Sequence, residues 1–323
     1  MRIRLLIALL LSFVVAEPVA AKTPVVFAAF ATPLEEPWNM VIHEALEAAS
    51  KGGRIEYTWQ DQLDSEPSMA AAIESRIGRV DIVVADAIDG ETSIRRLAAA
   101  HPQVAFLVGS AREPAPPNLS IFDSDLSEAA YLCGVAAGRL TKSGVIGVVA
   151  GKSDLYVHRT INAFLDGAHE VNPSAKVKVQ FIDAWFDPPK ARATALAQIA
   201  GGADVIYAER EGAIAAAREK GVLAFGNLVD RHFEAPDTVI TGPVWSMVPV
   251  IDHVVRQAAG GIVRGDSLVD FSRLGRGGVT LAPWHGWESK LPAEVVELVR
   301  EKEVALKAGR LEIQPSSDRP VGD

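Results

Sequence analysis

The chain alternates short apolar runs with stretches whose apolar residues recur at helical spacing. Continuous runs such as TPVVFAAF, VDIVVAD, VIGVVAG and ADVIYAE are typical of strands that are buried on both faces. Helical spacing is found at 38–50, 68–78, 126–141, 157–169, 191–201 and 248–260. This alternation predicts an α/β fold in which helices cover both faces of parallel sheets.

The apolar runs are too numerous for one sheet, so we expect two doubly wound, Rossmann-like lobes. No Pro/Gly-rich linker separates two halves of the chain, which favours several crossovers between the lobes. We expect lobe 1 to comprise 22–122 plus about 245–270. Lobe 2 is expected to comprise 123–244 plus about 271–323.

The first 21 residues, 1–21, have the pattern of a signal peptide. Two arginines near the start precede an apolar run over 5–15, and the small residues Val19 and Ala21 suit cleavage before Lys22. The run is shorter than the roughly 20 apolar residues that a membrane-spanning helix needs. We therefore expect export of the chain with a cleaved signal peptide.

The single cysteine, Cys133, bears on the compartment. One cysteine cannot form an internal disulfide, and this one lies too far from the signal peptide to carry an N-terminal lipid. Export without disulfides is compatible with the bacterial periplasm. We expect a periplasmic protein without a lipid anchor.

The overall charge narrows the class of partner. The formal net charge is −9, whereas a nucleic-acid-binding protein would present a basic surface. Hydrophobic residues make up 49% of the chain, enough for the cores of two lobes. We expect a small-molecule ligand, no nucleic-acid partner and a monomer.

Ligands of doubly wound sheets bind beyond the carboxyl ends of the strands. Side chains that directly follow the apolar runs are therefore candidates for a binding site. These candidates are Trp38, Asp86, Ser110, Asp123, Trp185, Asp187, Glu209, Asn227 and Trp245.

Motifs of catalysis are missing from the sequence. The segment GKSD at 151–154 lacks the earlier glycine of a phosphate-binding loop, since Ile146 stands there. Neither G-x-G-x-x-G, G-x-S-x-G nor H-E-x-x-H occurs, and the seven histidines show no metal-ligand spacing. We expect a binding protein rather than an enzyme, with no cofactor and no metal.

Three of the six tryptophans follow predicted strands or open a helix beside the expected cleft: Trp38, Trp185 and Trp245. Flat aromatic faces in a cleft suit a planar ring or the apolar face of a sugar. Each tryptophan could instead pack in a core or between the lobes. Their common placement favours the binding interpretation.

Polar side chains near these tryptophans could complete the site. The amide of Asn39 can donate and accept, as the edge of a nucleobase requires. Asp230 could accept hydrogen bonds from ligand hydroxyls, or it could cap a helix or pair with Arg231. Asp187 precedes two prolines and a helix, which favours a capping role.

An ordered set of segments resembles the basic membrane protein family, also called PnrA-like proteins. The segments, spread over roughly 35–242, are EEPWN, FDSDLSEAAYLCGVAAGRLTKSGVIGVVAG, INAFLDGAHEVNP, AWFDPPKA, GGADVIYAE and FGNLVDRHFEAPDTVITG. The resemblance implies the type I periplasmic binding protein fold and the substrate-binding role in an ABC importer. It also implies a membrane permease as partner and, often, a purine nucleoside as ligand.

The resemblance assigns site residues by motif. The family's two aromatic rings around the purine correspond to Trp38, followed by Asn39, and to Trp185. Its later acidic residue corresponds to Asp230, with Asn227 nearby. Two departures weaken the ribose site: Trp245 stands near the position of a usual lysine, and AAFATP at 28–33 lacks a usual aspartate. We therefore expect a planar, less hydroxylated ligand such as a free or oxidised purine base.

Other functions stay open at this point. A sugar could use Asp86, Asp123 and Arg112 for hydrogen bonds and a tryptophan for stacking. A sensor-linked binding protein would present its closed form to a receptor instead of a permease. A nucleoside hydrolase on a similar scaffold is a third alternative, for which no nucleophile–base pair is visible.

Overall fold

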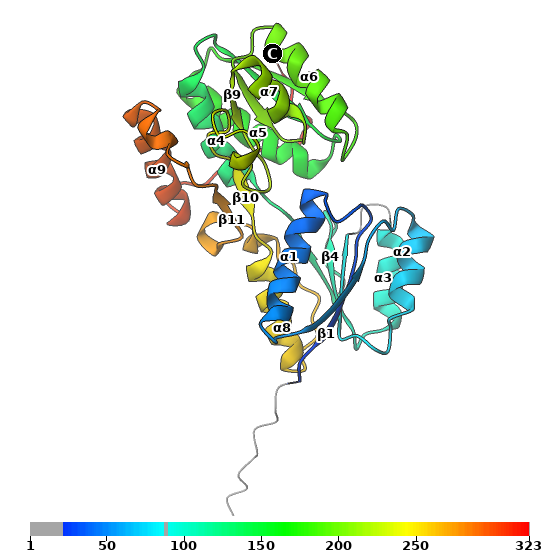
Figure 1. Ribbon diagram of the computed structural model, residues 1–323. Helices are drawn as coiled ribbons and strands as arrows, with labels where there is room; N and C mark the ends of the chain where they lie inside the picture. Colours follow the sequence, from blue (N-terminus) through cyan, green and yellow to red (C-terminus); the bar gives the residue numbers. More distant parts are fainter. Residues whose placement is uncertain (1–21, 87–89, 323) are drawn as a thin grey trace, which may run out of the picture.

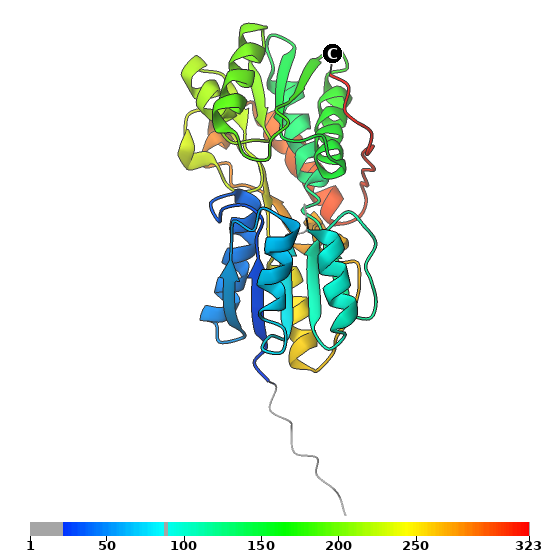
Figure 2. The same ribbon diagram turned by 90° about the vertical axis from the view of Figure 1, so that its right-hand side faces the viewer.

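The computed structural model describes residues 22–86 and 90–322, and these form two lobes (Figures 1 and 2). The predicted signal peptide, 1–21, lies outside the described residues. Among the helices that are described, none combines the length and the apolar character needed to cross a membrane.

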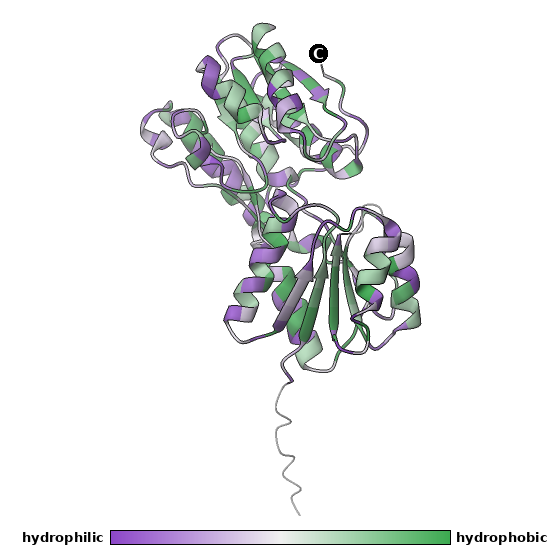
Figure 3. Cartoon of the chain, turned by 45° about the vertical axis from the view of Figure 1, so that its right-hand side comes forward, coloured by the Kyte–Doolittle hydropathy of each residue, from purple (hydrophilic) through white to green (hydrophobic). Residues whose placement is uncertain are grey.

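The first lobe contains a five-stranded parallel sheet in the order β2-β1-β3-β4-β5. Alternate residues of β1 belong to different cores: Val26 packs with helices on one face and Phe27 with helices on the other. Hydropathy colouring shows these apolar strands between helices with polar outer sides (Figure 3). The elements are β1 (Val25–Ala29), β2 (Glu56–Gln60), β3 (Ile82–Asp86), β4 (Ala105–Gly109), β5 (Leu119–Phe122), α1 (Pro37–Lys51), α2 (Glu66–Glu74), α3 (Glu91–Ala100) and α8 (Val248–Ala259).

The second lobe contains a four-stranded parallel sheet in the order β7-β6-β8-β9. Helices α6 and α7 pack against each other, while α9 packs on α4 (Figure 1). The elements are β6 (Val145–Ala150), β7 (Lys176–Phe181), β8 (Val205–Ala208), β9 (Leu223–Phe225), α4 (Ser127–Leu140), α5 (Leu155–Val171), α6 (Pro188–Ala200), α7 (Ala213–Lys220) and α9 (Ala293–Lys307).

Helices α4 and α5 approach each other closely because glycines face the partner backbone. A Cβ atom at Gly134 would lie 2.0 Å from the carbonyl oxygen of Phe164, and one at Gly167 would lie 2.1 Å from that of Tyr131. Cys133 is buried in the same contact region, with 1% of its surface exposed. The small residues of AAYLCGVAAG thus let the two helices form the centre of the second lobe.

Within the described residues the chain crosses between the lobes three times: after β5, before α8, and between α8 and α9. The antiparallel pair β10 (Pro243–Trp245) and β11 (Val279–Leu281) lies between the lobes (Figure 1). One hydroxyl ties the crossing segments together. Ser272 accepts a 3.3 Å hydrogen bond from the indole Nε1 of Trp245 and donates to the backbone carbonyl of Asp123.

The predicted fold class, two doubly wound α/β lobes joined by several crossovers, is confirmed. Helices α3, α7 and α9 are not among the helices predicted from the sequence. Strand β7 ends at Phe181, and Asp183 in the loop that leads to Trp185 adopts a left-handed conformation with φ of 55°. The expected lobe boundaries, 22–122 with 245–270 and 123–244 with 271–323, stay a prediction.

Candidate functional site

A cavity of about 230 Å³ lies where the carboxyl ends of both sets of strands meet. In each sheet the strand order reverses direction beside the first strand, β1 or β6, and ligands of open α/β sheets bind at such switch points. The volume lies below the ~300–1,000 Å³ of many ligand pockets, which favours a small ligand.

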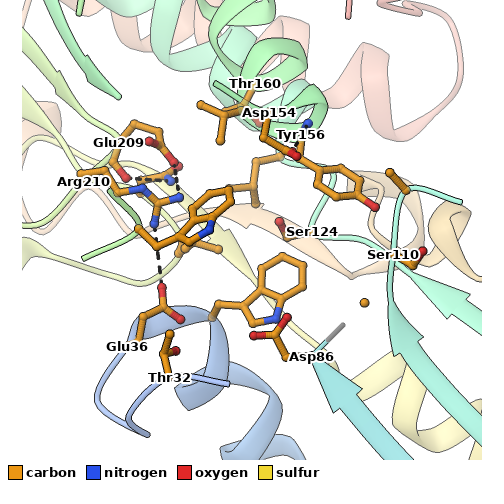
Figure 4. Close-up of a pocket in the computed structure, with 18 of the residues that line it drawn as sticks. Thr32, Glu36, Asp86, Ser110, Ser124, Asp154, Tyr156, Thr160, Glu209 and Arg210 are labelled. Atoms are coloured by element: carbon orange, nitrogen blue, oxygen red, sulfur yellow. Dashed lines mark hydrogen bonds and ion pairs between the residues drawn. The ribbon is translucent and has the colours of Figure 1, made fainter. Parts of the chain in front are cut away.

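Both lobes and a crossover line the cavity (Figure 4). The first lobe contributes Thr32, Glu36, Trp38, Asp86, Glu91, Gly109, Ser110 and Ala111. The crossover and second lobe contribute Ser124, Leu126, Asp154, Tyr156, Val157, Thr160, Trp185, Glu209, Arg210, Asn227 and Leu228.

The structure brings four of the seven predicted site residues to this cavity. They are Trp38, Asp86, Trp185 and Asn227. The strand-end candidates Ser110 and Glu209 line it as well. The other three predicted residues, Asn39, Asp230 and Trp245, are not among the lining residues and have other contacts.

Trp38 lies in the first turn of α1. The helix begins here because Pro37 occupies its first position and the Glu36 carboxylate accepts a 3.3 Å hydrogen bond from the backbone N–H of Asn39. The indole packs on the ring of Trp245, with centroids 4.6 Å apart. At the end of β4, a Cβ on Gly109 would lie 3.0 Å from Trp38 Cζ2, so glycine makes room for the indole.

The side chain of Asn39 supports the loop between β1 and α1. Its Nδ2 donates to the Thr32 hydroxyl at 2.7 Å, to the Thr32 carbonyl at 3.0 Å and to the Pro33 carbonyl at 3.2 Å. The residue is fully buried. Asn39 therefore holds the backbone beside Trp38 instead of presenting its amide to the cavity.

Trp245 and Asp230 have structural partners outside the cavity. Trp245 is 2% exposed and lies behind Trp38, with its Nε1 bonded to Ser272. The Asp230 carboxylate accepts from the His232 backbone at 3.0 Å and lies 2.6 Å from His285 Nε2.

Asn227 reaches the cavity from the loop after β9. Its Oδ1 accepts a 2.8 Å hydrogen bond from the hydroxyl of the buried Tyr207, and its Nδ2 lies 3.4 Å from the Glu209 carbonyl. These bonds fix the orientation of the amide. Asp187, which the sequence assigned to capping, is the N-cap of α6 and accepts from the Lys190 backbone at 3.0 Å.

A buried ion-pair cluster joins the two lobes at the cavity, and the sequence analysis missed its centre, Arg210. The guanidinium lies 3.0 Å from Glu209 and 3.8 Å from Glu36 (Figure 4). Burial, which outweighs the attraction of Arg210, raises the pKa of Glu209 to about 7 and also raises that of Glu36. The position of Arg210, directly after the apolar run of β8 and Glu209, was the available signal.

Tyr156 and Thr160 reach the cavity from the first turns of α5 and were also missed. The helix begins because the Asp154 carboxylate caps it, accepting a 2.9 Å hydrogen bond from the Tyr156 backbone. Burial raises the pKa of the Tyr156 hydroxyl, so the phenol is protonated near neutral pH. A helix that directly follows the strand VIGVVAG was the signal for both residues.

Trp185 follows β7 and lies near two cationic side chains. Arg210 Cζ is 5.1 Å and Lys152 Nζ is 5.6 Å from the centroid of an indole ring. These contacts orient the ring at the cavity. Among the described residues, no group of three or more His, Cys, Asp or Glu side chains could hold a metal ion.

Comparison with known proteins matches residues 24–302 to the profile of the family described as ABC transporter substrate-binding protein PnrA-like. A purine-binding protein of Brucella abortus is 29% identical over 252 residues, which cover 71% of this chain and 70% of that protein. A protein of Haloferax volcanii named as a candidate ABC transporter glucose-binding protein is also 29% identical, over 64% of this chain and 54% of its own length.

The fold has solved counterparts. The structure of an ABC transporter solute-binding protein from Aeropyrum pernix superimposes with a TM-score of 0.77 at 17% identity, covering 91% of this chain and 94% of that one. The architecture is thus that of a type I periplasmic binding protein, as expected. On the profile match over most of its length, the chain belongs to the PnrA-like family of ABC transporter substrate-binding proteins.

Proposed function

We propose that this protein captures a purine base or nucleoside between its lobes and delivers it to the permease of an ABC importer, without chemical turnover. One observation carries the proposal: Trp38 from the first lobe and Trp185 from the second line the same small cavity. Indole faces bind planar rings by stacking and by burial of apolar area. The name of the Brucella abortus relative, a purine-binding protein, supports the same ligand class.

Closure of the lobes is the proposed mechanism of capture. A ligand that contacts Trp38 and Trp185 together has its full set of contacts only when the lobes are closed, so binding shifts the population toward closure. The ion pair between Glu36 and Arg210 acts in the same direction, because its partners belong to different lobes. Export to the periplasm, with cleavage before Lys22, and a monomeric state belong to this proposal.

Sugar binding is the second candidate. Carboxylates at the cavity, Asp86 and Glu91 among them, are a type of group that hydrogen-bonds sugar hydroxyls, and one relative carries a glucose-binding name. One oxygen of Glu91, Oε1, already has two partners, however: it accepts from Arg95 Nε at 2.7 Å and from the Ser110 hydroxyl at 2.6 Å. We therefore place the purine ahead of the sugar.

Alanine substitutions of the two tryptophans test the proposal. Stacking on an aromatic side chain contributes about 1–3 kcal/mol per base, so Trp38→Ala and Trp185→Ala should each weaken binding of hypoxanthine roughly 10- to 100-fold. Titration calorimetry measures the affinity. Trp59→Ala is the matched control, since Trp59 is 44% exposed on β2 and does not line the cavity. Unchanged affinity in both cavity variants would exclude capture by these rings.

A further inference from the structure

Residues that line the cavity carry buried hydrogen-bond donors that have no partner among the described residues. Four lining residues have such an atom: Nε1 of Trp38, Nε1 of Trp185, the hydroxyl of Tyr156 and Nε of Arg210. The two indole nitrogens and the guanidinium nitrogen can only donate, whereas a tyrosine hydroxyl can donate and accept. Buried polar groups are normally paired, so a cluster of unpaired donors at one cavity requires an explanation.

Each carboxylate at the same cavity has at least one partner. Glu36 accepts from the Asn39 backbone and faces Arg210, and Glu209 accepts from the Gly151 backbone at 2.8 Å and pairs with Arg210. The remaining three lining carboxylates also have interactions: Glu91 with Arg95 and Ser110, Asp154 with Tyr156, and Asp86 with a partner of its own. Among the described lining residues, the buried side-chain atoms without a partner can therefore all donate a hydrogen bond.

The unpaired donors indicate which ligand chemistry fits the cavity. A ligand that presents acceptors satisfies the indole N–H groups and the tyrosine hydroxyl, and the unfavourable desolvation of those donors is relieved on binding. A ligand that presents amino groups or a cation would leave these donors without acceptors. An indole N–H lies in the plane of its ring, so a planar ring with carbonyl oxygens can stack on one of the two indoles and accept from the N–H of the other.

We propose that the cavity selects a neutral, carbonyl-bearing planar heterocycle, such as an oxopurine, over its amino-substituted analogue through the hydroxyl of Tyr156 and the N–H group of the indole, Trp38 or Trp185, on which the ring does not stack. The inference rests on the proposed function and narrows its ligand class. It makes Tyr156, a residue of α5, a specificity-determining residue.

The test compares xanthine, hypoxanthine, adenine and unsubstituted purine by titration calorimetry on the purified protein. Xanthine, with two carbonyl groups, should bind about tenfold more tightly than adenine, and hypoxanthine should fall between them. Tyr156→Phe, Trp38→Phe and Trp185→Phe keep an aromatic ring and remove one donor each. Tyr156→Phe and one of the two tryptophan variants should each weaken xanthine binding roughly three- to tenfold, the range for one neutral hydrogen bond, with at most a twofold change for unsubstituted purine. Trp59→Phe is the control and should change neither.

Two results would overturn this inference while leaving the proposed function in place. One is adenine or purine binding as tightly as xanthine. The other is an equal loss for xanthine and purine in all three phenylalanine variants, which would mean that the side chains act through packing alone. Absence of binding by all four compounds and by their nucleosides would instead overturn the proposed function, and the inference with it.

Discussion

The indole rings of Trp38 and Trp245 lie with their centroids 4.6 Å apart and their planes inclined by 33°. Trp38 lines the cavity, whereas Trp245 belongs to a segment that crosses between the lobes. Through its Nε1, Trp245 is bonded to Ser272, which in turn donates to the carbonyl of Asp123 on another crossing segment. The ring of Trp38, which contacts the ligand in our proposal, therefore packs on the hydrogen-bonded segments that cross between the lobes.

Substitutions of Trp245 should separate its support of the Trp38 ring from its hydrogen bond to Ser272. Trp245→Ala removes a buried aromatic side chain and the support of Trp38, so the free energy of unfolding should fall by about 3–5 kcal/mol and ligand binding should weaken. Trp245→Phe keeps an aromatic ring but loses the bond to Ser272. It should lower the free energy of unfolding by about 1–2 kcal/mol and change affinity less than threefold. Urea unfolding and calorimetry measure the two quantities. Equal effects of the two variants on binding would contradict the supporting role.

The stability of the protein should depend on pH through Glu209. Burial raises its pKa from 4.5 to about 7 in the folded state, so the folded protein binds more protons than the unfolded chain between these values. The contribution of Glu209 to the free energy of unfolding is therefore fully present below about pH 4.5. It is lost as the pH rises toward 7, by up to about 3 kcal/mol. Glu209→Gln should reduce this loss.

The measurement is the free energy of unfolding at steps between pH 4.5 and 7.5 for both proteins. The informative quantity is the difference in slope, because Glu209→Gln also changes the contact with Arg210 and so shifts stability by an amount that does not depend on the ionisation of Glu209. Glu56→Gln, on an exposed residue of β2, serves as the control. Parallel curves for the wild type and Glu209→Gln would show that Glu209 does not titrate in this window.

The contact between α4 and α5 should tolerate no added methyl group at Gly134. A Cβ there would lie 2.0 Å from the Phe164 carbonyl oxygen, so Gly134→Ala must displace one helix and should destabilise the fold by about 3 kcal/mol or more. Gly260→Ala is the matched control, since its nearest neighbour would lie at an ordinary 3.4 Å. Urea unfolding of both variants measures the difference in stability. Similar midpoints would mean that the helices pack less closely than described.

The sequence predicted the alternation of strands and helices because buried parallel strands are continuous apolar runs. The rule that ligands bind beyond strand ends correctly predicted four residues that line the cavity: Trp38, Asp86, Trp185 and Asn227. It works because the carboxyl ends of the strands in a parallel sheet all lie at one edge. The rule says where a residue lies along the chain and not which way its side chain points. Trp245 illustrates this limit: it follows the predicted strand, but it packs behind Trp38.

Loop conformation decided the contacts of the remaining site residues. The bond of Asn39 to Thr32 depends on the path of the loop between β1 and α1, and the contact of Asp230 with His285 depends on how two loops distant in the sequence meet. Arg210 was missed for a related reason. Its importance comes from Glu36, a residue of the other lobe, which only the assembled structure places beside it.

The most direct test of ligand capture is the melting temperature of the protein after any bound ligand has been removed by unfolding and refolding. Purine bases, nucleosides, pentoses and hexoses are added separately. A ligand at 100 times its dissociation constant should stabilise the protein by about 2.7 kcal/mol, which raises the melting temperature by several degrees. We predict a rise with purines, absent in the Trp38→Ala, Trp185→Ala double variant. A rise with sugars alone, or none with any purine, would contradict the proposed function.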